Sequence, residues 1–160
     1  MIDVATVRDM LDFDPETGEF AWRNPIGTKV KAGQRAGNRR HDGYWRIRVC
    51  GELHLSHRLA WLHAYGVWPT KHIDHINGDT SDNRLCNLRD ASRAENAQNQ
   101  RTPMVTNTSG LLGVSKDGNR WRARIYVAGH ETVIGYFDTP QAAHSAYVEA
   151  KRRDHAGCTI

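Results

Sequence analysis

The residues best suited to chemistry lie close together between positions 72 and 99. Asp74 and His75 are adjacent, and Asn87 and Asn96 follow at short intervals. Carboxylate and amide oxygens are the ligands that hard divalent cations prefer. An imidazole titrates near neutral pH and can act as a general base. This set of side chains therefore indicates metal-assisted hydrolysis, with a histidine that activates water.

The elements that must position these side chains can be predicted from the same stretch. Residues 72–76 alternate as a β-strand does, and residues 77–83 are rich in turn-forming types. A short return segment through Leu88 then leads to Ser92-Arg93-Ala94-Glu95, which has the pattern of a helix capping box. The predicted unit is therefore strand, loop, strand and helix, with Asn96 in the first helical turn.

A family resemblance rests on these positions. Asp74-His75, Asn87-Leu88 and Asn96 resemble the three signature positions of the HNH (His-Asn-His) nucleases, which use a ββα-metal motif. The wider pattern is similar to that of phage and intron-type homing endonucleases, and it covers roughly residues 13–99: HRLAW…WP…IDHINGD…DNR…NLR…N.

The resemblance implies a role for each of these residues. His75 is expected to be the general base, and Asn87 a catalytic-site residue that braces the loop and orients His75. Asp74 and Asn96 are expected to bind the metal. Because Asn96 stands where the family has its last histidine, the expected ion is Mg²⁺, with Mn²⁺ as the alternative, rather than Zn²⁺.

Composition excludes several classes of protein. The chain has 160 residues, of which 39% are hydrophobic, and its mean hydropathy is -0.67. It has no apolar run of membrane-spanning length, and its N-terminus lacks the features of a signal peptide. The three cysteines show no CxxC spacing, which argues against a zinc finger or a disulfide framework. These features predict a cytoplasmic protein without a membrane partner, located in a bacterial host cell if it is phage-borne.

Positive charge is concentrated in one part of the chain. The net charge is +4, but residues 23–48 contain eight cations and a single acid, an excess of seven. A glycine-rich loop in this segment carries Arg39 and Arg40. It precedes a predicted hairpin over residues 43–55 that turns at Gly51-Glu52. The clustering predicts contact with the phosphate backbone of double-stranded DNA, and a solvated basic loop is the alternative. The outward face of the hairpin is predicted to contribute Tyr44, Arg46 and Arg48.

Two helices are also predicted in the first part of the chain. One covers residues 1–12, where apolar residues have helical spacing. The other covers residues 57–65, with Ser56 as its cap and Gly66 at its end.

A second unit is predicted over residues 111–157. Three strands are expected, at residues 112–116, 120–127 and 132–137, followed by a helix that starts at Pro140. The middle strand alternates, so that Trp121 and its neighbours face a core. The opposite, outward face carries Arg120, Arg122, Arg124 and Tyr126.

This second unit resembles the Apetala/ethylene-response-factor DNA-binding domain through the pattern GV…WRARI…IGYFDT…AAHSAY. The resemblance implies that the exposed sheet face reads the major groove, with Arg122, Arg124 and Tyr126 as readers and Arg120 on the same face. Glu131 stands near a position where the family has a cation, which departs from that pattern. An ordinary sheet with a solvated arginine face is the alternative.

Together these patterns predict an α+β protein. A ββα-metal HNH unit with a hairpin and helix extension is expected over residues 1–99, a linker over 100–110, and the Apetala-like domain over 111–160. The expected function is that of a metal-dependent DNA endonuclease, a site-preferring homing or mobile-element nickase of phage type. A monomer is expected, and a dimer is the alternative. One rival is a non-catalytic DNA-binding regulator with a relict HNH unit. The other is a structural-metal scaffold protein, against which the scarcity of thiol ligands argues.

Overall fold

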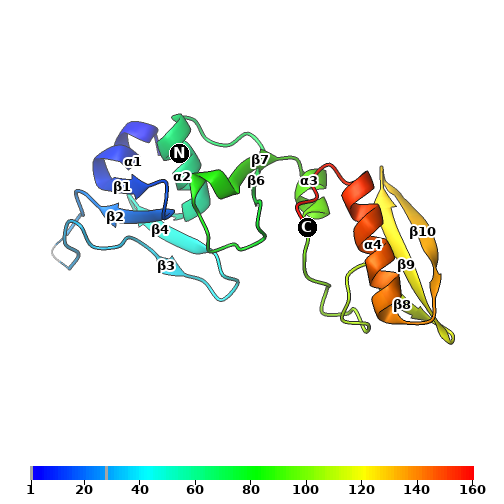
Figure 1. The fold of residues 1–160 in the computed structure, drawn as a ribbon. Helices are drawn as coiled ribbons and strands as arrows, with labels where there is room; N and C mark the ends of the chain where they lie inside the picture. Colours follow the sequence, from blue (N-terminus) through cyan, green and yellow to red (C-terminus); the bar gives the residue numbers. More distant parts are fainter. Residues whose placement is uncertain (1, 28) are drawn as a thin grey trace. The chain divides into compact units, whose positions relative to one another are not determined.

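The chain forms two compact units in a computed structural model that describes residues 2–27 and 29–160 (Figure 1). The first unit extends to Ser92, and the second runs from Arg93 to Ile160. Both combine small antiparallel sheets with helices, so the predicted α+β class is confirmed. Within the described residues, no helix has the length and apolar character needed to cross a lipid bilayer.

The N-terminal unit begins with helix α1 (Val4–Met10), and Asp3 caps this helix by accepting a hydrogen bond from the Thr6 amide. The helix is shorter than residues 1–12, because Leu11 is extended and starts strand β1 (Leu11–Asp14). Strand β1 pairs antiparallel with β2 (Glu19–Trp22). The turn between these strands ends at Gly18, whose φ is 74°. A Cβ atom on Gly18 would lie 2.9 Å from Cα of Asn83 and closer still to the backbone that follows.

A three-stranded antiparallel sheet follows, with β4 (Trp45–Val49) between β3 (Asn38–Arg39) and β5 (Glu52–Leu55). The hairpin turns at Cys50 and Gly51, one residue before the predicted turn. Both residues have positive φ, 48° and 82°, as the turn of a two-residue hairpin requires.

Helix α2 (Ser56–Tyr65) follows β5 directly. The prediction that Ser56 caps this helix is wrong: Leu55 occupies the cap position without a side-chain hydrogen bond, and Ser56 is already helical. The predicted end is confirmed, because Gly66 is left-handed and its amide donates to the Leu62 carbonyl.

Strands β6 (His72–His75) and β7 (Leu88–Ala91) form the predicted pair, with the short 3₁₀ helix η1 (Leu85–Asn87) before β7. Their register places His75 opposite Leu88. The buried core of the unit includes residues of both helices, of β1, β2 and β4, and of both strands of this pair, so the pair packs against the other elements. Its members are Val7, Met10, Leu11, Phe20, Ala36, Ile47, Val49, Leu59, Ala60, Leu62, Ile73 and Leu88.

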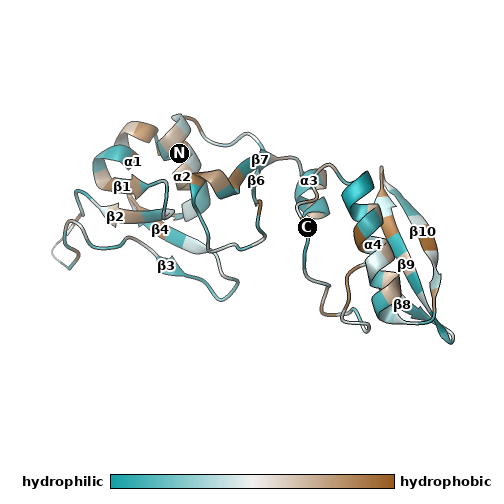
Figure 2. Ribbon diagram, in the orientation of Figure 1, coloured by the Kyte–Doolittle hydropathy of each residue, from teal (hydrophilic) through white to brown (hydrophobic). Residues whose placement is uncertain are grey.

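The second unit contains the predicted sheet, in which β9 (Arg120–Val127) lies between β8 (Val114–Asp117) and β10 (His130–Phe137). Helix α4 (Pro140–Asp154) starts as predicted, with Thr139 capping it by accepting from the Ala142 amide. Figure 2 shows hydrophilic and hydrophobic residues alternating along β9. The hydrophobic face packs against α4, and the buried core consists of Val114, Ala123, Ile125, Ala143, Tyr147 and Ala150.

Helix α3 (Arg93–Gln98) belongs to this second compact unit. The Gly157 amide donates to the Gln98 side chain, and the Lys151 ammonium donates to the Gln100 carbonyl. The segment over residues 100–110 also forms bonds of its own, such as the one from the Asn107 side chain to the Leu111 carbonyl. The predicted functional boundaries at residues 99 and 110 stay predictions, but the contacts group α3 with the C-terminal sheet.

Candidate active site

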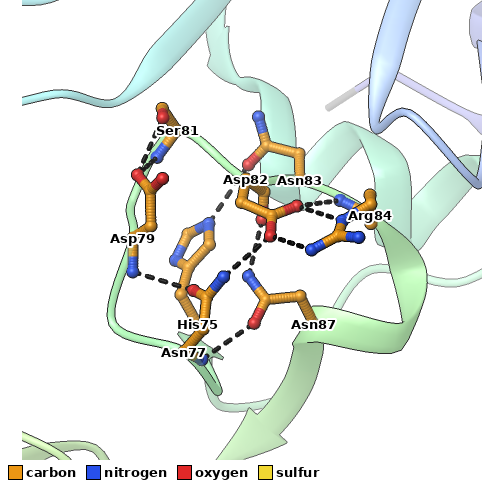
Figure 3. Close-up of polar contacts among 8 residues, drawn as sticks. All are labelled: His75, Asn77, Asp79, Ser81, Asp82, Asn83, Arg84 and Asn87. Atoms are coloured by element: carbon orange, nitrogen blue, oxygen red, sulfur yellow. Dashed lines mark hydrogen bonds and ion pairs between the residues drawn. The ribbon is translucent and has the colours of Figure 1, made fainter.

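His75 ends strand β6 and is almost completely buried, with 4% of its surface exposed. Its Nε2 lies 3.1 Å from Oδ1 of Asn83 (Figure 3), and Asn83 is itself buried. An amide oxygen only accepts hydrogen bonds, so Nε2 must carry the proton in this arrangement. In the neutral ring the lone pair is then on Nδ1, which is the form that a general base needs. No role was predicted for Asn83, which lies in the turn-forming run and in the DNR part of the family pattern.

The protonation state of His75 follows from its surroundings. Burial lowers the pKa of His75, and this effect outweighs the hydrogen bond to Asn83, which raises it. The carboxylates of Asp74, Asp79 and Asp82 also act to raise the pKa, but they too are outweighed. The imidazole is therefore neutral near pH 7 and able to accept a proton.

Asn87 closes the loop that follows His75. Its Oδ1 accepts from the Asn77 amide at 2.8 Å, and its Nδ2 donates to the Asp82 carbonyl at 2.8 Å (Figure 3). Its own carbonyl accepts from the Ile76 amide at 2.8 Å. These three bonds join both ends of the loop to one residue. This is the arrangement that a loop brace requires, and the catalytic consequence stays a prediction.

Side chains of the loop also bind one another. Asn77 donates to Asp82 at 2.7 Å, and Arg84 donates to both oxygens of the same carboxylate. The hydrogen bond from Arg84 is the largest cause that lowers the pKa of Asp82 to about 2. Asp79 accepts from the amide and the hydroxyl of Ser81 (Figure 3). The loop is thus held by charged and neutral hydrogen bonds in a single conformation around His75.

Asp74 is buried beside His75 and pairs with an arginine of the adjacent strand. The register of β6 and β7 places Arg89 opposite Asp74, and Nε and Nη2 of Arg89 donate to Oδ2 at 2.8 and 2.7 Å. No role was predicted for Arg89, which lies in the NLR part of the family pattern. A cation bound to Asp74 would share this carboxylate with the guanidinium.

The donor set fits a hard divalent cation in its chemistry. Asp74 offers a carboxylate and Asn96 an amide oxygen, which are ligand types that Mg²⁺ binds. Within the part of the chain that the structure describes, no three or more His, Cys, Asp or Glu residues gather around a common metal position. Mg²⁺ commonly keeps waters and phosphate oxygens among its ligands, so it does not require such a cluster. The first unit holds Asp74, His75 and Asn87, and Asn96 lies on α3, which belongs to the second unit.

Two further rings pack against His75. The ring centroid of His57 lies 5.2 Å from that of His75 in an edge-to-face arrangement, and Tyr44 lies 5.4 Å from His57 and 5.8 Å from His75. Burial lowers the pKa of His57 to about 3, with smaller contributions from His75 and Arg58. Its buried Nδ1 has no hydrogen-bond partner among the described residues. Tyr44, predicted as a DNA contact, is half-buried in this ring cluster.

The predicted basic residues of the N-terminal unit are spread over the sheet β3–β5. Arg46 and Arg48 line a surface cavity of about 390 Å³ together with Arg35, another of the eight cations of the basic segment. Arg39 is exposed. Arg40 forms an ion pair with Asp42 at 2.9 Å, which reduces the positive charge of the surface at this place. This face offers three arginines to one concave surface.

The arginines of β9 face outward as predicted, but each is paired with an acid. Arg124 lies 2.8 Å from Glu131, whereas the other two pairs are looser. Tyr126 is 62% exposed on the same face. The ion pairs reduce the positive charge that this sheet presents. The two looser pairs are Arg120 with Asp138 at 3.6 Å and Arg122 with Asp117 at 3.9 Å.

Comparison with known proteins gives a match over the part of the chain that holds this site. Residues 54–98 match the family described as HNH endonuclease. The chain is also 40% identical over 78 residues to "Protein 3.8" of Escherichia phage T7, which covers 47% of this chain and 64% of that protein. The chain therefore spans less than two thirds of this relative's length. No solved structure matches it significantly.

The family match ends at residue 98, so it does not reach the C-terminal sheet, whose Apetala-like character stays a prediction. It does include Asp74, His75, Asn87 and Asn96. The four residues predicted to act in catalysis or metal binding thus lie within the stretch that is similar to HNH endonucleases.

Proposed function

We propose that this chain is a metal-dependent DNA endonuclease that hydrolyses phosphodiester bonds. The observation that carries the proposal is the state of His75: it is buried and neutral, and Asn83 fixes its tautomer. His75 ends β6, next to Asp74 in the sequence, where the loop that Asn87 closes begins. A base with a directed lone pair next to a carboxylate is the constellation that phosphodiester hydrolysis needs.

In this proposal His75 accepts a proton at Nδ1 from the attacking water, and Asn87 holds the loop that positions the ring. Asp74 and Asn96 would hold Mg²⁺, with Mn²⁺ as the alternative ion. When bound, a divalent metal supplies Lewis-acid stabilisation of the negative charge that develops on the leaving oxygen. Arg89 orients the Asp74 carboxylate before DNA arrives, through two hydrogen bonds to Oδ2.

DNA is bound by two surfaces in this proposal. The N-terminal sheet contributes Arg39, Arg40, Arg46 and Arg48, and Tyr44 supports the rings of the site. The C-terminal sheet contributes sequence preference. Contacts to base edges determine which DNA sequence is preferred, whereas contacts to phosphates determine how the protein is placed on the duplex. Its arginines would exchange their acidic partners for DNA. Its proposed readers are Arg120, Arg122, Arg124 and Tyr126.

The finer assignment is a site-preferring homing or mobile-element nickase of phage type. Each chain carries one His75, so one monomer cuts one strand in each binding event. Two chains acting on opposite strands would be needed for a double-strand break. The match to a phage T7 protein supports the phage connection and a bacterial cytoplasm as the site of action.

Nicking of supercoiled plasmid tests the proposal, with Mg²⁺, Mn²⁺ or EDTA present. Wild type is expected to nick only with metal, and His75→Ala to nick about 10²–10⁴-fold more slowly, while DNA affinity changes by no more than a few-fold. His72→Ala is a matched control, because His72 lies in the same strand but is exposed. Nicking by His75→Ala at the wild-type rate would contradict the assignment of the base.

One observation favours a second candidate, a DNA-binding regulator without catalysis. Arg89 already pairs with Asp74, so a metal must compete with the guanidinium for this carboxylate. Salt-dependent DNA binding by wild type, with no nicking in Mg²⁺ or Mn²⁺, would establish this alternative and refute the endonuclease.

A further inference from the structure

We infer that the C-terminal tail, residues 155–160, positions helix α3 and so sets the place of Asn96. This inference rests on the proposed role of Asn96 as a metal ligand. It assigns a function in the site to residues far away in the sequence, none of which would touch metal or DNA.

Helix α3 cannot hold its own geometry. It has six residues, and none of them is buried. Isolated helices of this length are only marginally stable in water, because too few hydrogen bonds offset the entropy of forming the first turn. The position of Asn96 must therefore be determined by what packs against the helix.

The tail lies directly on the backbone of α3. Gly157 is buried, and its amide donates to Oε1 of Gln98 at 3.0 Å. A Cβ atom on Gly157 would lie 2.9 Å from Cα of Glu95 and 3.0 Å from its carbonyl carbon, and closer still to the carbonyl oxygen. That carbonyl belongs to the peptide that joins Glu95 to Asn96. Only a residue without a side chain leaves this peptide in place.

Three more contacts hold the end of α3. Lys151 of α4 is 1% exposed, and its ammonium donates to the Gln100 carbonyl at 2.5 Å. Arg101 donates to the carbonyl and the hydroxyl of Thr159 at 2.8 and 2.6 Å. The same hydroxyl bonds to the side chain of Asn99, which is also buried. The residues that follow α3 are thus tied to both α4 and the tail.

These contacts make α3 part of the body that carries the proposed DNA-reading sheet. Helix α4 packs on that sheet through Ala143, Tyr147 and Ala150. Helix α3 is attached to α4 and to the tail, so a shift of the sheet on DNA carries Asn96 with it. The tail therefore fixes Asn96 relative to the proposed DNA-reading sheet of the same unit.

The test adds a single methyl group. Gly157→Ala in the full chain is compared with wild type and with Ala156→Ser, which changes the neighbouring exposed residue. In the Gly157 variant, hydrogen exchange of the amides over residues 95–99 is expected to accelerate at least about tenfold, while β9 amides stay protected. The Mg²⁺ concentration for half-maximal nicking is expected to rise at least about tenfold, and DNA affinity in EDTA to stay within about twofold. Ala156→Ser is expected to match wild type in all three measurements.

Thr159→Val provides a second variant if Gly157→Ala unfolds the unit, because it removes the hydroxyl but keeps the shape of the side chain. It is expected to show the same pattern with smaller changes. Unchanged exchange over residues 95–99 in both variants would overturn the inference. So would faster exchange with an unaltered Mg²⁺ requirement. If wild type never nicks DNA, the proposed function fails, and the exchange measurement still decides whether the tail holds α3.

Discussion

Replacing His57 by phenylalanine is expected to remove a large part of the protein's sensitivity to mild acid. The side chain is 6% exposed and lies against the rings of His75 and Tyr44, with Arg58 nearby. Because burial holds the pKa of His57 near 3, the folded protein keeps this ring neutral, whereas an unfolded chain protonates it near pH 6.5. Stability from this group is thus complete above about pH 6.5 and declines as the pH falls toward 3.

The magnitude follows from the two pKa values. Each pH unit between them is worth about 1.4 kcal/mol, so the part of the decline that lies above pH 5.0 amounts to about 2 kcal/mol. Phenylalanine does not titrate, and it also removes the unpartnered Nδ1 from the interior. Between pH 7.5 and 5.0 the variant should therefore lose about 2 kcal/mol less stability than wild type.

Urea unfolding followed by tryptophan fluorescence can measure this difference. Four of the five tryptophans, at positions 22, 45, 61 and 68, lie in the first compact unit, so the signal reports mainly on that unit. With a urea dependence of about 1–3 kcal/mol per molar, the difference is a shift of roughly 1 M in the unfolding midpoint. Leu59→Val serves as the control, because it weakens the same core equally at both pH values.

An equal loss of stability for wild type and His57→Phe would refute this reasoning. It would mean that the buried ring is protonated in the folded protein, or that acid unfolds the unit through other groups alone.

Three further changes have expected outcomes. Asn87→Ala should slow nicking at least about tenfold. It should also lower the free energy of unfolding by about 1–3 kcal/mol, because the two loop bonds of this buried side chain are lost. Nicking at the normal rate would remove Asn87 from the site. Arg39→Ala with Arg40→Ala should flatten the salt dependence of DNA binding by about 1 rather than about 2, since Asp42 already neutralises Arg40; an unchanged slope would mean that neither contacts phosphate. Glu131→Gln should release Arg124 and steepen the salt dependence of DNA binding by about 1. Arg124→Ala should weaken the binding free energy by about 1–3 kcal/mol at the preferred site and change it little on random DNA.

Local patterns in the sequence were sufficient to predict the elements around the site. The alternation over residues 72–76 and the turn-forming run after it predicted β6 and its loop, and both are confirmed. Asn87 bonds to both ends of that loop, and its role in the site stays a prediction. In the C-terminal unit, strict alternation along β9 and Pro140 at the helix start predicted the sheet and α4. Each of these features depends on residues close together in the chain.

Features that depend on distant residues were not predictable in this way. Asn83 bonds to His75 only because of the path of the loop, and Arg89 meets Asp74 through the register of two strands. A register argument from the loop length could have suggested Arg89. The prediction that Ser56 caps α2 was wrong because β5 continues into α2 without a break. The placement of α3 depends on Gly157, near the other end of the second unit.

Gly18 has a consequence for how this protein could be varied. Its backbone is left-handed, and any side chain there would enter the space of the Asn83 backbone, which is the residue that orients His75. Glu16 and Thr17 in the same turn are exposed and leave room for other residues. A saturation library selected for nicking would therefore retain glycine at position 18 as strictly as histidine at 75, while the adjacent positions drift. Gly18 and His75 would then be equally intolerant of substitution, although Gly18 takes no part in the reaction. Only the left-handed backbone angle of Gly18 would distinguish its structural role from the chemical role of His75.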